Sequence, residues 1–370
     1  MCEPVAPARS AGRIAVAMSG GVDSSVAALI LHRQGESLVG LSLQLHDASG
    51  GESGRAGRCC SPRDFLDARL VAERVGFPFY VLNMEREFRR SVIDDFVREY
   101  REGRTPIPCA HCNTQVKFKD LLLRATTLGC QRLATGHYAR LAWDPVAGRT
   151  RLMRARDREK DQSYFLFGLT PFQMDRALFP VGDLTKAAVR ELAREAQLGV
   201  AEKPESMDLC FLPEGDPGSF LERELSGEGP GEGEIVDGSG KVLGRHRGVH
   251  RYTVGQRRGL GIPGSDALYV LEIRAGEKRI VVGTREDQLR GGCHVPVPNW
   301  IGIDPVTKPV DALIQIRHRH PPAEGTLLPD ARGGVAVRFR EAQRAVAPGQ
   351  AAVFYRDDLL LGGGFIHSAH

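Results

Sequence analysis

In the first third of the chain, short apolar runs typical of strands alternate with segments whose apolar residues have helical spacing. Four short apolar runs predict β-strands, at residues 14–17, 37–45, 79–82 and 132–135. Between them, apolar residues at helical spacing predict helices over residues 64–75, 85–101 and 116–128. Strands that alternate with helices predict an α/β fold with a doubly wound parallel sheet. Ligands of such sheets bind at the carboxyl ends of the strands.

The hydrophobic pattern changes after residue 204. Residues 168–198 have a helical pattern, interrupted by Pro180 and Gly182. Short β-like runs then recur, at residues 234–236, 269–273, 279–282, 312–316, 335–339 and 352–355. Several short strands with few helices predict small β-barrels or a sandwich. We therefore expect an α/β domain over residues 1–208, a β-rich domain over 209–290 and a C-terminal β-barrel domain over 291–370.

The composition argues against a secreted, a membrane-spanning and a disulfide-rich protein. The 370 residues contain neither a secretory leader nor an apolar run of membrane-spanning length, so we expect a cytoplasmic protein with no membrane partner. Eight cysteines are too few for a disulfide scaffold, and cysteine pairs in a reducing compartment indicate chemistry or metal binding. The net charge is only +4, but basic residues cluster at 149–160, 245–258 and 317–320. Such clusters fit either nucleic-acid phosphates or solvated strand faces.

A glycine-rich turn, Ser19-Gly20-Gly21-Val22-Asp23-Ser24-Ser25, follows the first predicted strand and opens a helix. Adjacent glycines let the backbone approach a ligand, and the free N–H groups of a helix N-terminus attract anions. The lysine of a Walker loop is absent. The order of residues instead resembles the pyrophosphate loop of enzymes that cleave ATP between its α and β phosphates. The alternative is an ordinary capped helix after a glycine turn.

A second motif, Cys109-Ala110-His111-Cys112, is expected in a loop marked by Pro106 and Pro108. A thiol near the start of the following helix would have a lowered pKa and act as a nucleophile. Cys210 is far away in sequence, and spacing alone does not bring it to Cys112. The alternative for the pair is half of a zinc site, completed by His111 or by Cys59 and Cys60.

Taken together, these motifs and their order resemble the bacterial tRNA-specific 2-thiouridylases over nearly the whole chain. The matching stretches are residues 19–25, 103–106, 112–113, 117–119, 134–140, 160–166, 206–211, 252–261, 348–350 and 361–364. The resemblance implies an adenine nucleotide α-hydrolase-like domain followed by two small β-rich domains. It also implies ATP-dependent 2-thiolation of the wobble uridine in the anticodon stem-loops of Lys, Glu and Gln tRNAs. ATP and Mg²⁺ would be required, and a cysteine desulfurase or a sulfur-relay protein would donate the sulfur.

The same resemblance implies roles for individual residues. Cys210 would carry a persulfide, and Cys112 would be the catalytic thiol. The ATP site would comprise Ala17, Met18, Ser19, Gly20, Gly21, Val22, Asp23, Ser24, Leu43 and Gly136. The target base would lie near Ile107, Pro108 and Cys109. Other tRNA contacts would be made by His137, Lys160, Asp161, Gln162, Arg317, His318 and Gln350.

One position departs from the family pattern. Many members have Asn-Pro-Asp where this chain has Ile107-Pro108-Cys109, so a thiol replaces a carboxylate. Cys109, Cys112 and Cys210 could therefore hold a [4Fe–4S] cluster, whose open iron would bind sulfide. Two further classes of function remain open from the sequence. An ATP-dependent amide-forming ligase would leave the distant cysteines unexplained, and a non-catalytic RNA-binding protein would leave the glycine-rich turn unexplained.

Overall fold

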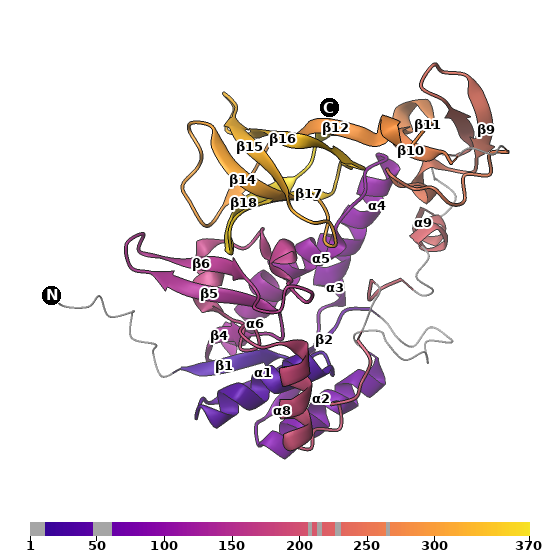
Figure 1. Cartoon of the computed structure of the whole chain (residues 1–370). Helices are drawn as coiled ribbons and strands as arrows, with labels where there is room; N and C mark the ends of the chain where they lie inside the picture. The colour runs from indigo at the N-terminus through magenta and orange to yellow at the C-terminus, as the bar shows by residue number, and fades with distance from the viewer. Residues whose placement is uncertain (1–11, 47–60, 206–208, 213–216, 226–230, 264–266) are drawn as a thin grey trace. The chain divides into compact units, whose positions relative to one another are not determined.

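The computed structural model describes residues 12–46, 61–205, 209–212, 217–225, 231–263 and 267–370 (Figure 1). The chain forms two compact units, each built from separate stretches of sequence. The first unit comprises Met1–Ser91, Cys109–Phe211 and Asp358–Leu360. The second comprises Val92–Pro108, Leu212–Asp357 and Leu361–His370. Residues 92–108 thus lie in a different unit from the residues on either side of them in sequence.

The first unit is centred on a five-stranded parallel sheet, which confirms the predicted doubly wound α/β fold. Its strands are β1 (Arg13–Ala17), β2 (Leu38–Gln44), β3 (Phe79–Asn83), β4 (Cys130–Ala134) and β7 (Ala177–Leu178). Their order across the sheet is β3-β2-β1-β4-β7, and every neighbouring pair is parallel. The carboxyl ends of β1 and β4 therefore meet at the same edge of the sheet.

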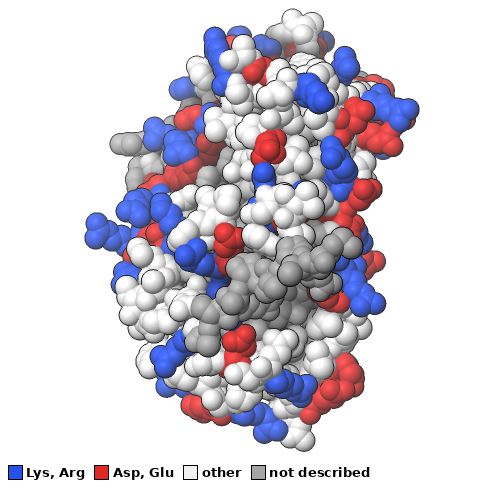
Figure 2. Space-filling view, turned by 90° about the vertical axis from the view of Figure 1, so that its left-hand side faces the viewer, with Lys and Arg blue, Asp and Glu red and all other residues white. Residues whose placement is uncertain are grey.

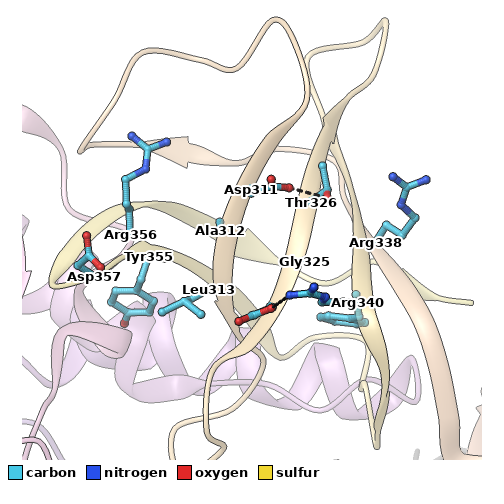
Figure 3. Close-up of a pocket in the computed structure, with 12 residues that line it drawn as sticks. Asp311, Ala312, Leu313, Gly325, Thr326, Arg338, Arg340, Tyr355, Arg356 and Asp357 are labelled. Carbon is cyan, nitrogen blue, oxygen red and sulfur yellow. Dashed lines mark hydrogen bonds and ion pairs between the residues drawn. The ribbon is translucent and has the colours of Figure 1, made fainter.

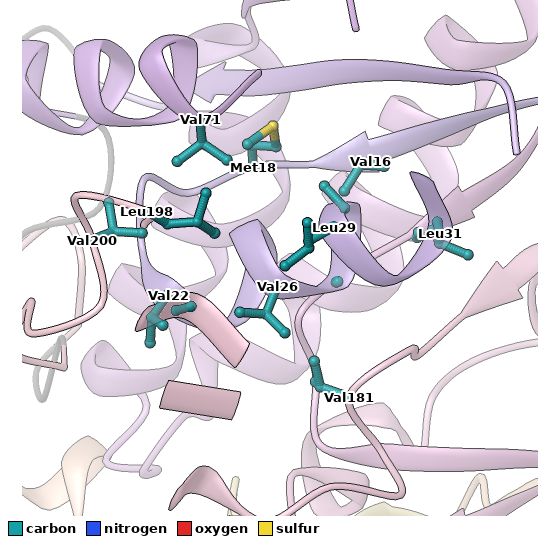
Figure 4. Close-up of a cluster of buried hydrophobic side chains, with 14 of the residues drawn as sticks. Val16, Met18, Val22, Val26, Leu29, Leu31, Val71, Val181, Leu198 and Val200 are labelled. Carbon is teal, nitrogen blue, oxygen red and sulfur yellow. The ribbon is translucent and has the colours of Figure 1, made fainter. Parts of the chain in front are cut away.

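One face of this sheet is covered by α1 (Val22–Arg33), α2 (Pro62–Val75) and α8 (Lys186–Glu195) (Figure 1). Apolar side chains from the helices and the sheet, such as Val16, Val26 and Val71, form a buried cluster between them (Figure 4). Each fully buried side chain of this size contributes about 1.5–3 kcal/mol. The helix α2 begins with a capping box, in which the Ser61 and Asp64 side chains each accept from the other's backbone N–H.

The two helices expected over residues 85–101 and 116–128 are present, and both contain π-helical segments. The first is α3 (Glu85–Phe88), η1 (Arg89–Ile93) and α4 (Asp94–Arg101). The second is α5 (Pro108–His111), η2 (Cys112–Leu121) and α6 (Leu122–Thr127). The expected loop around Cys109 and Cys112 is therefore wrong. Pro108 opens the helix, because a proline in the first turn loses no hydrogen bond.

A hairpin that the sequence did not predict follows β4. It consists of β5 (Ala139–Asp144) and β6 (Arg149–Arg154), and Leu359 of β18 (Leu359–Phe365) pairs with Met153. The helical pattern expected over residues 168–198 is realised only in part, as α7 (Pro171–Arg176) and α8. Charged residues alternate along the hairpin, and among its residues only Ala139 and Leu152 are fully buried apolar residues, so its hydrophobic pattern is weak.

The second unit contains the two β-rich regions that the sequence predicts. The first has the strand order β10-β11-β8-β9, with β8 (Gly233–Val236), β9 (Val242–His246), β10 (Tyr269–Arg274) and β11 (Arg279–Gly283). The other has the order β19-β12-β16-β15-β14-β17. Its strands are β12 (Leu289–Val295), β14 (Val310–Gln315), β15 (Ala323–Pro329), β16 (Val335–Arg344), β17 (Ala351–Arg356) and β19 (Ser368–Ala369). In addition, β13 (Asn299–Trp300) pairs with β18.

The helix α4 belongs to this second unit and packs against α9 (Pro217–Leu225). Phe96 of α4 is almost completely buried, and its ring lies 6.1 Å from that of Phe220 in α9. The ring of Tyr100, one turn later, lies 4.9 Å from that of Phe96. Among the residues that the structure describes, no helix is long and apolar enough to cross a membrane.

Candidate functional site

The glycine-rich turn after β1 is closed by hydrogen bonds between its own residues. The Ser24 hydroxyl accepts from the Ser19 N–H at 3.2 Å and donates to the Gly21 carbonyl at 3.2 Å. Gly20 has a φ of +72°, and a Cβ there would lie 2.3 Å from the Asp64 carbonyl oxygen. The position therefore requires glycine for its backbone conformation and for its close approach to α2. The turn leaves Ser19 exposed.

Two further residues predicted for the ATP site lie around this turn. Gly136 follows β4, and a Cβ there would lie only 2.5 Å from the Ser24 backbone nitrogen. Leu43 is buried in β2, next to Ser42, whose hydroxyl donates to the Met18 carbonyl at 2.6 Å. The predicted ATP-site residues thus come together at the carboxyl ends of β1, β2 and β4, where such folds bind ligands.

Asp23, in the first turn of α1, is paired with a lysine that the sequence analysis missed. The Lys186 ammonium at the start of α8 donates to both Asp23 carboxylate oxygens, at 2.7 and 2.8 Å. The Tyr138 hydroxyl donates to the same carboxylate at 2.8 Å. Burial, and then the Asp23 charge, raise the pKa of Tyr138 well above its ordinary value. A cation and a neutral phenol therefore flank the carboxylate beside the anion-binding turn.

A second lysine contacts the turn from the other side. The Lys203 ammonium donates to the Gly20 carbonyl at 2.9 Å, to Asp64 at 2.7 Å and to Asp67 at 2.5 Å. Burial disfavours the charge on Lys203, but the two carboxylates outweigh it and raise its pKa. Lys203, which precedes Cys210 in sequence, therefore bonds to both the glycine-rich turn and α2.

We expect the Lys203→Met variant to lose about 1–3 kcal/mol of unfolding free energy, because it leaves Asp64 without its cation. Because the pKa of Lys203 is raised on folding, this contribution is full below the unfolded pKa of about 10.4 and is lost as pH rises through the folded pKa. Urea unfolding at pH 7 measures the loss. Lys119→Met is the matched control, since exposed Lys119 makes its described hydrogen bond to Gln115 in the same helix and contacts no carboxylate there. Equal stability of the two variants would contradict the expectation.

Glu205 extends this ionic network toward the cysteines. Its carboxylate accepts from Lys160 at 2.8 Å and pairs with Lys186 at 3.0 Å. Burial would raise the pKa of Glu205, but the hydrogen bonds from the two lysines outweigh it and lower the pKa. Lys186 thus contacts Asp23 in the turn and Glu205 five residues before Cys210. Two residues that precede Cys210 in sequence, Lys203 and Glu205, therefore bond to the glycine-rich turn or to its lysine, Lys186.

The cysteine pair lies in the same unit. Cys112 is buried at the first residue of η2, and the neighbouring Asn113 side chain donates to the Phe165 carbonyl at 3.3 Å. Cys210 is half-buried, and the ring of the next residue, Phe211, lies 5.9 Å from that of Phe88 in α3. Since α3 also packs against η2, the two cysteine-bearing segments share one neighbouring helix.

Cys109, by contrast, is exposed on α5. Cys109, Cys112 and Cys210 all belong to the part of the chain that the structure describes. Within that part, no group of three or more His, Cys, Asp or Glu side chains is placed to bind a metal ion. The described residues therefore contain no preformed ligand set for the [4Fe–4S] cluster, and the zinc site that would include Cys59 and Cys60 is not tested. Cys59 and Cys60 lie outside the described residues.

The residues expected to contact tRNA have different surroundings. His137 packs its ring against Phe118 and Phe179, and burial followed by the nearby Lys117 charge lowers its pKa well below the ordinary value. Its imidazole is therefore neutral near pH 7, so any RNA contact would depend on hydrogen bonding or stacking. The Asp161 side chain is nearly buried and accepts from the Ala155 N–H and the Ser163 hydroxyl. The Asp161 carboxylate thus stabilises the backbone between Ala155 and Ser163.

The remaining predicted tRNA contacts are divided between the two units. The Gln162 side chain accepts from the Tyr138 N–H at 2.9 Å, next to the Asp23 carboxylate. In the second unit, Arg317 is exposed and His318 half-buried in the turn after β14. The Gln350 amide donates to the Thr105 carbonyl at 3.1 Å.

Much of the basic charge noted in the sequence is neutralised by ion pairs. In the first cluster, Arg151 pairs with Asp144, Arg154 with Asp161 and Arg158 with Asp358. On the face shown in Figure 2, lysine and arginine side chains are interspersed with aspartate and glutamate. The first basic cluster, residues 149–160, is therefore not simply a row of positive charges available to bind phosphates.

A cavity of about 760 Å³ lies over strands β14 to β17 and is lined by polar and apolar side chains (Figure 3). Two of its charged groups have partners within the lining: Arg340 pairs with Glu324, and Asp311 accepts from the Thr326 hydroxyl at 2.8 Å. None of the site residues predicted from the sequence lines it. We therefore assign it no part in the candidate site.

Comparison with known proteins agrees with this arrangement. The tRNA methyl transferase HUP domain model matches residues 12–214, the tRNA methyl transferase PRC-barrel domain model 218–284, and the aminomethyltransferase beta-barrel domain model 290–366. The chain is 49% identical over 366 residues to the tRNA-specific 2-thiouridylase MnmA of Solibacter usitatus, covering 95% of this chain and 98% of the relative. It is 50% identical over 360 residues to the protein of that name from Geobacter metallireducens, covering 96% and 97%.

Proposed function

The chain belongs to the tRNA-specific 2-thiouridylase family, and we propose that it uses ATP to transfer sulfur to carbon 2 of the wobble uridine in tRNA. One structural observation carries the proposal. Lys203 and Glu205, which precede Cys210 in sequence, bond to the glycine-rich turn and to its lysine, Lys186. These contacts support a single site that combines activation of the base with delivery of sulfur. The Lys, Glu and Gln tRNAs are the proposed substrates.

In the first step, the uracil oxygen at carbon 2 attacks the α-phosphate of ATP, and pyrophosphate leaves. The N–H groups at the start of α1 are available to the phosphates, as at other helix N-termini. Lys186 and Lys203 supply positive charge on two sides of the turn. This positive charge would stabilise the negative charge of the leaving pyrophosphate. In a Walker loop, the lysine of the loop itself has that role. The predicted ATP residues from Ala17 to Ser24, with Leu43 and Gly136, would form the rest of this site.

Mg²⁺ is expected to accompany ATP and to neutralise part of the phosphate charge. The described residues offer it no set of three protein ligands. We therefore propose that the nucleotide itself holds the ion, since Mg²⁺ commonly keeps several waters and binds mainly through substrate phosphates.

In the second step, the terminal sulfur of a Cys210 persulfide attacks the activated carbon 2, and AMP leaves. The base is then joined to Cys210 through two sulfur atoms. The Cys112 thiolate attacks the inner sulfur, which releases the 2-thiouridine and forms a Cys112–Cys210 disulfide. An external thiol reductant restores both thiols, and a cysteine desulfurase or a sulfur-relay protein reloads Cys210.

The wobble base must leave its stack to reach these groups, as RNA loops allow. We propose that Ile107, Pro108 and Cys109 lie against the displaced base, because they open the helix that carries Cys112. His137, Lys160, Asp161, Gln162, Arg317, His318 and Gln350 stay as proposed tRNA contacts. Exposed Arg317 fits a phosphate best, whereas Asp161 and Gln162 would act by holding the backbone beside Tyr138.

Thiolation of an unmodified tRNA transcript tests this function. Purified protein, ATP, Mg²⁺ and a persulfide donor are combined, and the nucleosides are analysed by mass spectrometry. We expect 2-thiouridine to form only when ATP is present, with equal amounts of AMP and pyrophosphate. An amide-forming ligase or a non-catalytic RNA-binding protein would give no thiolated nucleoside, and that result would refute the proposal.

We expect the Cys109→Ala variant to thiolate tRNA within about twofold of the wild-type rate, because the Cys109 thiol takes part in no sulfur step of the proposed route and alanine still leaves a small apolar side chain beside the displaced base. The exposure of Cys109 and the missing three-ligand group both favour this outcome. Thiolation assays on anaerobically purified protein, with iron and sulfide analysis, measure it. A protein that contains iron, and that loses both iron and activity in the variant, would instead support the cluster.

A further inference from the structure

One turn of the second unit carries two adjacent exposed arginines, Arg257 and Arg258, from the second basic cluster noted in the sequence. We call residues 253–258 the arginine turn. The side chains on either side of it, Tyr252 and Leu260, are buried in an apolar cluster that also contains residues of β8, β10 and β11. Both ends of the arginine turn are therefore anchored in the core of this β-rich region.

The backbone of the arginine turn is fixed by hydrogen bonds. The Gln256 N–H donates to the Thr253 carbonyl at 3.0 Å, and the Gln256 side-chain oxygen accepts from the Thr253 N–H at 3.0 Å. The Gln256 side-chain amide donates to the Arg258 carbonyl at 3.0 Å. In β10, the Val270 carbonyl accepts from the Gly255 N–H at 2.8 Å, and the Val270 N–H donates to the Gln256 carbonyl at 2.9 Å. The Gln256 side chain therefore connects the two ends of the turn.

Glycines before and after the arginines set the path of the chain. Gly255 has a φ of +89°, and a Cβ there would lie 2.6 Å from the Cβ of Ala345 in the same unit. Gly259 has a φ of +76°. Residues with side chains rarely adopt such conformations, so both bends depend on glycine. Together with the hydrogen bonds, they hold the two arginines on a defined backbone, and little ordering of the turn is needed when a partner binds.

The two arginines differ in their charge balance from another exposed arginine of the same region. Arg279 of β11 pairs with Glu234 at 3.1 Å and with Glu277 at 3.4 Å. Arg257 and Arg258, by contrast, form no ion pair with any residue that the structure describes. Two positive charges of the arginine turn are therefore available to an anionic partner.

The chemistry of the arginine turn fits RNA phosphates better than a protein surface. A guanidinium is a planar fork of donors that matches two oxygens of one phosphate. Residues 253–259 include no exposed apolar side chain, and those that are exposed are Arg257, Arg258 and Gly259. The fully buried core of a protein–protein interface, by contrast, is mostly apolar. We therefore favour RNA as the partner.

We propose that the arginine turn binds the phosphate backbone of tRNA, with Arg257 and Arg258 as the contacts and Gln256 as the residue that positions them. The inference rests on the proposed function, because it takes tRNA as the substrate. It assigns a part of tRNA binding to the β8–β11 region, which contains none of the tRNA contacts proposed above. Since phosphates carry no sequence information, these contacts strengthen the binding of all tRNAs alike.

The double variant Arg257→Met/Arg258→Met tests the proposal, with Arg279→Met as the matched control. The tRNA Kd is measured at several salt concentrations, for a Lys tRNA and for a tRNA outside the Lys, Glu and Gln group. We expect the double variant to bind both tRNAs about fivefold to tenfold more weakly. The slope of log Kd against log salt concentration should fall by about 1.4–1.8, because each neutralised phosphate contributes about 0.7–0.9. The control should keep the wild-type slope, because glutamates already balance the Arg279 charge.

The positioning role of Gln256 is tested by Gln256→Met in two backgrounds. It should weaken the tRNA Kd of the otherwise wild-type protein but not that of the double arginine variant, since Gln256 acts through the two arginines. Equal losses in both backgrounds would contradict that role.

Two results would overturn the phosphate contact. One is a double variant whose Kd and salt slope match those of Arg279→Met. The other is a loss confined to binding of the sulfur-donor protein, which would assign the arginine turn to a protein partner. Single-turnover thiolation at saturating tRNA should stay within about twofold in the double variant. Wild-type protein that binds tRNA through the arginine turn but does not thiolate it would refute the proposed function alone.

Discussion

Cys112→Ser and Cys210→Ser variants should each lose tRNA 2-thiolation by at least about a thousandfold, the scale seen when a catalytic nucleophile is removed. A serine hydroxyl neither ionises near neutral pH nor carries a persulfide, so neither variant can complete the sulfur steps. Both cysteines lie away from the glycine-rich turn in sequence, and their replacement leaves Lys186 and Asp23 in contact. Both variants should therefore still form AMP-activated tRNA.

The two cysteine variants should differ in one measurement. Radioactive sulfur from a cysteine desulfurase should label Cys112→Ser on Cys210, whereas Cys210→Ser should remain unlabelled. Thiolated nucleoside is measured by mass spectrometry, and activation by pyrophosphate release. Cys109→Ala is the control for removal of a nearby thiol. Thiolation by either serine variant at a tenth of the wild-type rate would contradict the persulfide route.

Replacement of Lys186 by methionine is expected to lower kcat/KM for ATP by about 10²–10³, the effect of removing one preorganised donor to a developing anion. Lys186 lies 12% exposed between Asp23 and Glu205, so it is already placed where the phosphates would arrive. Methionine has nearly the same length but no charge. Pyrophosphate release at varied ATP concentration measures the loss.

Lys160→Met is the matched control for Lys186→Met. Lys160 shares the Glu205 carboxylate, but its ammonium bonds to no atom of the glycine-rich turn in the contacts described above. Its loss should leave kcat/KM for ATP within about threefold and mainly weaken tRNA binding. Similar losses of ATP activation in the two lysine variants would show that Glu205, rather than contact with the turn, determines the effect.

The period of the hydrophobic residues is sufficient to predict four of the five strands of the parallel sheet and the turn that follows β1, but not the two-residue strand β7. Both depend on local signals, namely apolar runs of strand length and two adjacent glycines before a helix. The two lysines could not be predicted in this way. Lys186 and Lys203 are 163 and 183 residues from their partners Asp23 and Gly20, and neither lies in a glycine-rich motif. Only the packing of α8 on α1 brings Lys186 to the turn.

The prediction that Cys109 and Cys112 lie in a loop failed for a different reason. Pro106 and Pro108 were interpreted as loop residues, although a proline is equally suited to the first position of a helix. The β5–β6 hairpin was missed because charged residues alternate along it, and ion pairs such as Arg151–Asp144 stabilise it where apolar packing does not. Partners of this kind are visible only once the strands are paired.

The assignment of Val92–Pro108 to the second unit has a consequence for synthesis of the protein. Translation proceeds from the N-terminus, so Phe96 emerges from the ribosome long before Phe220, whose ring it packs against. Until α9 is made, Phe96 and the apolar face of α4 lack this partner. A chain cut after Phe211 would not contain Phe220 and would leave that face of α4 without it. Synthesis of α9 therefore completes the packing of a helix that was made much earlier in the chain.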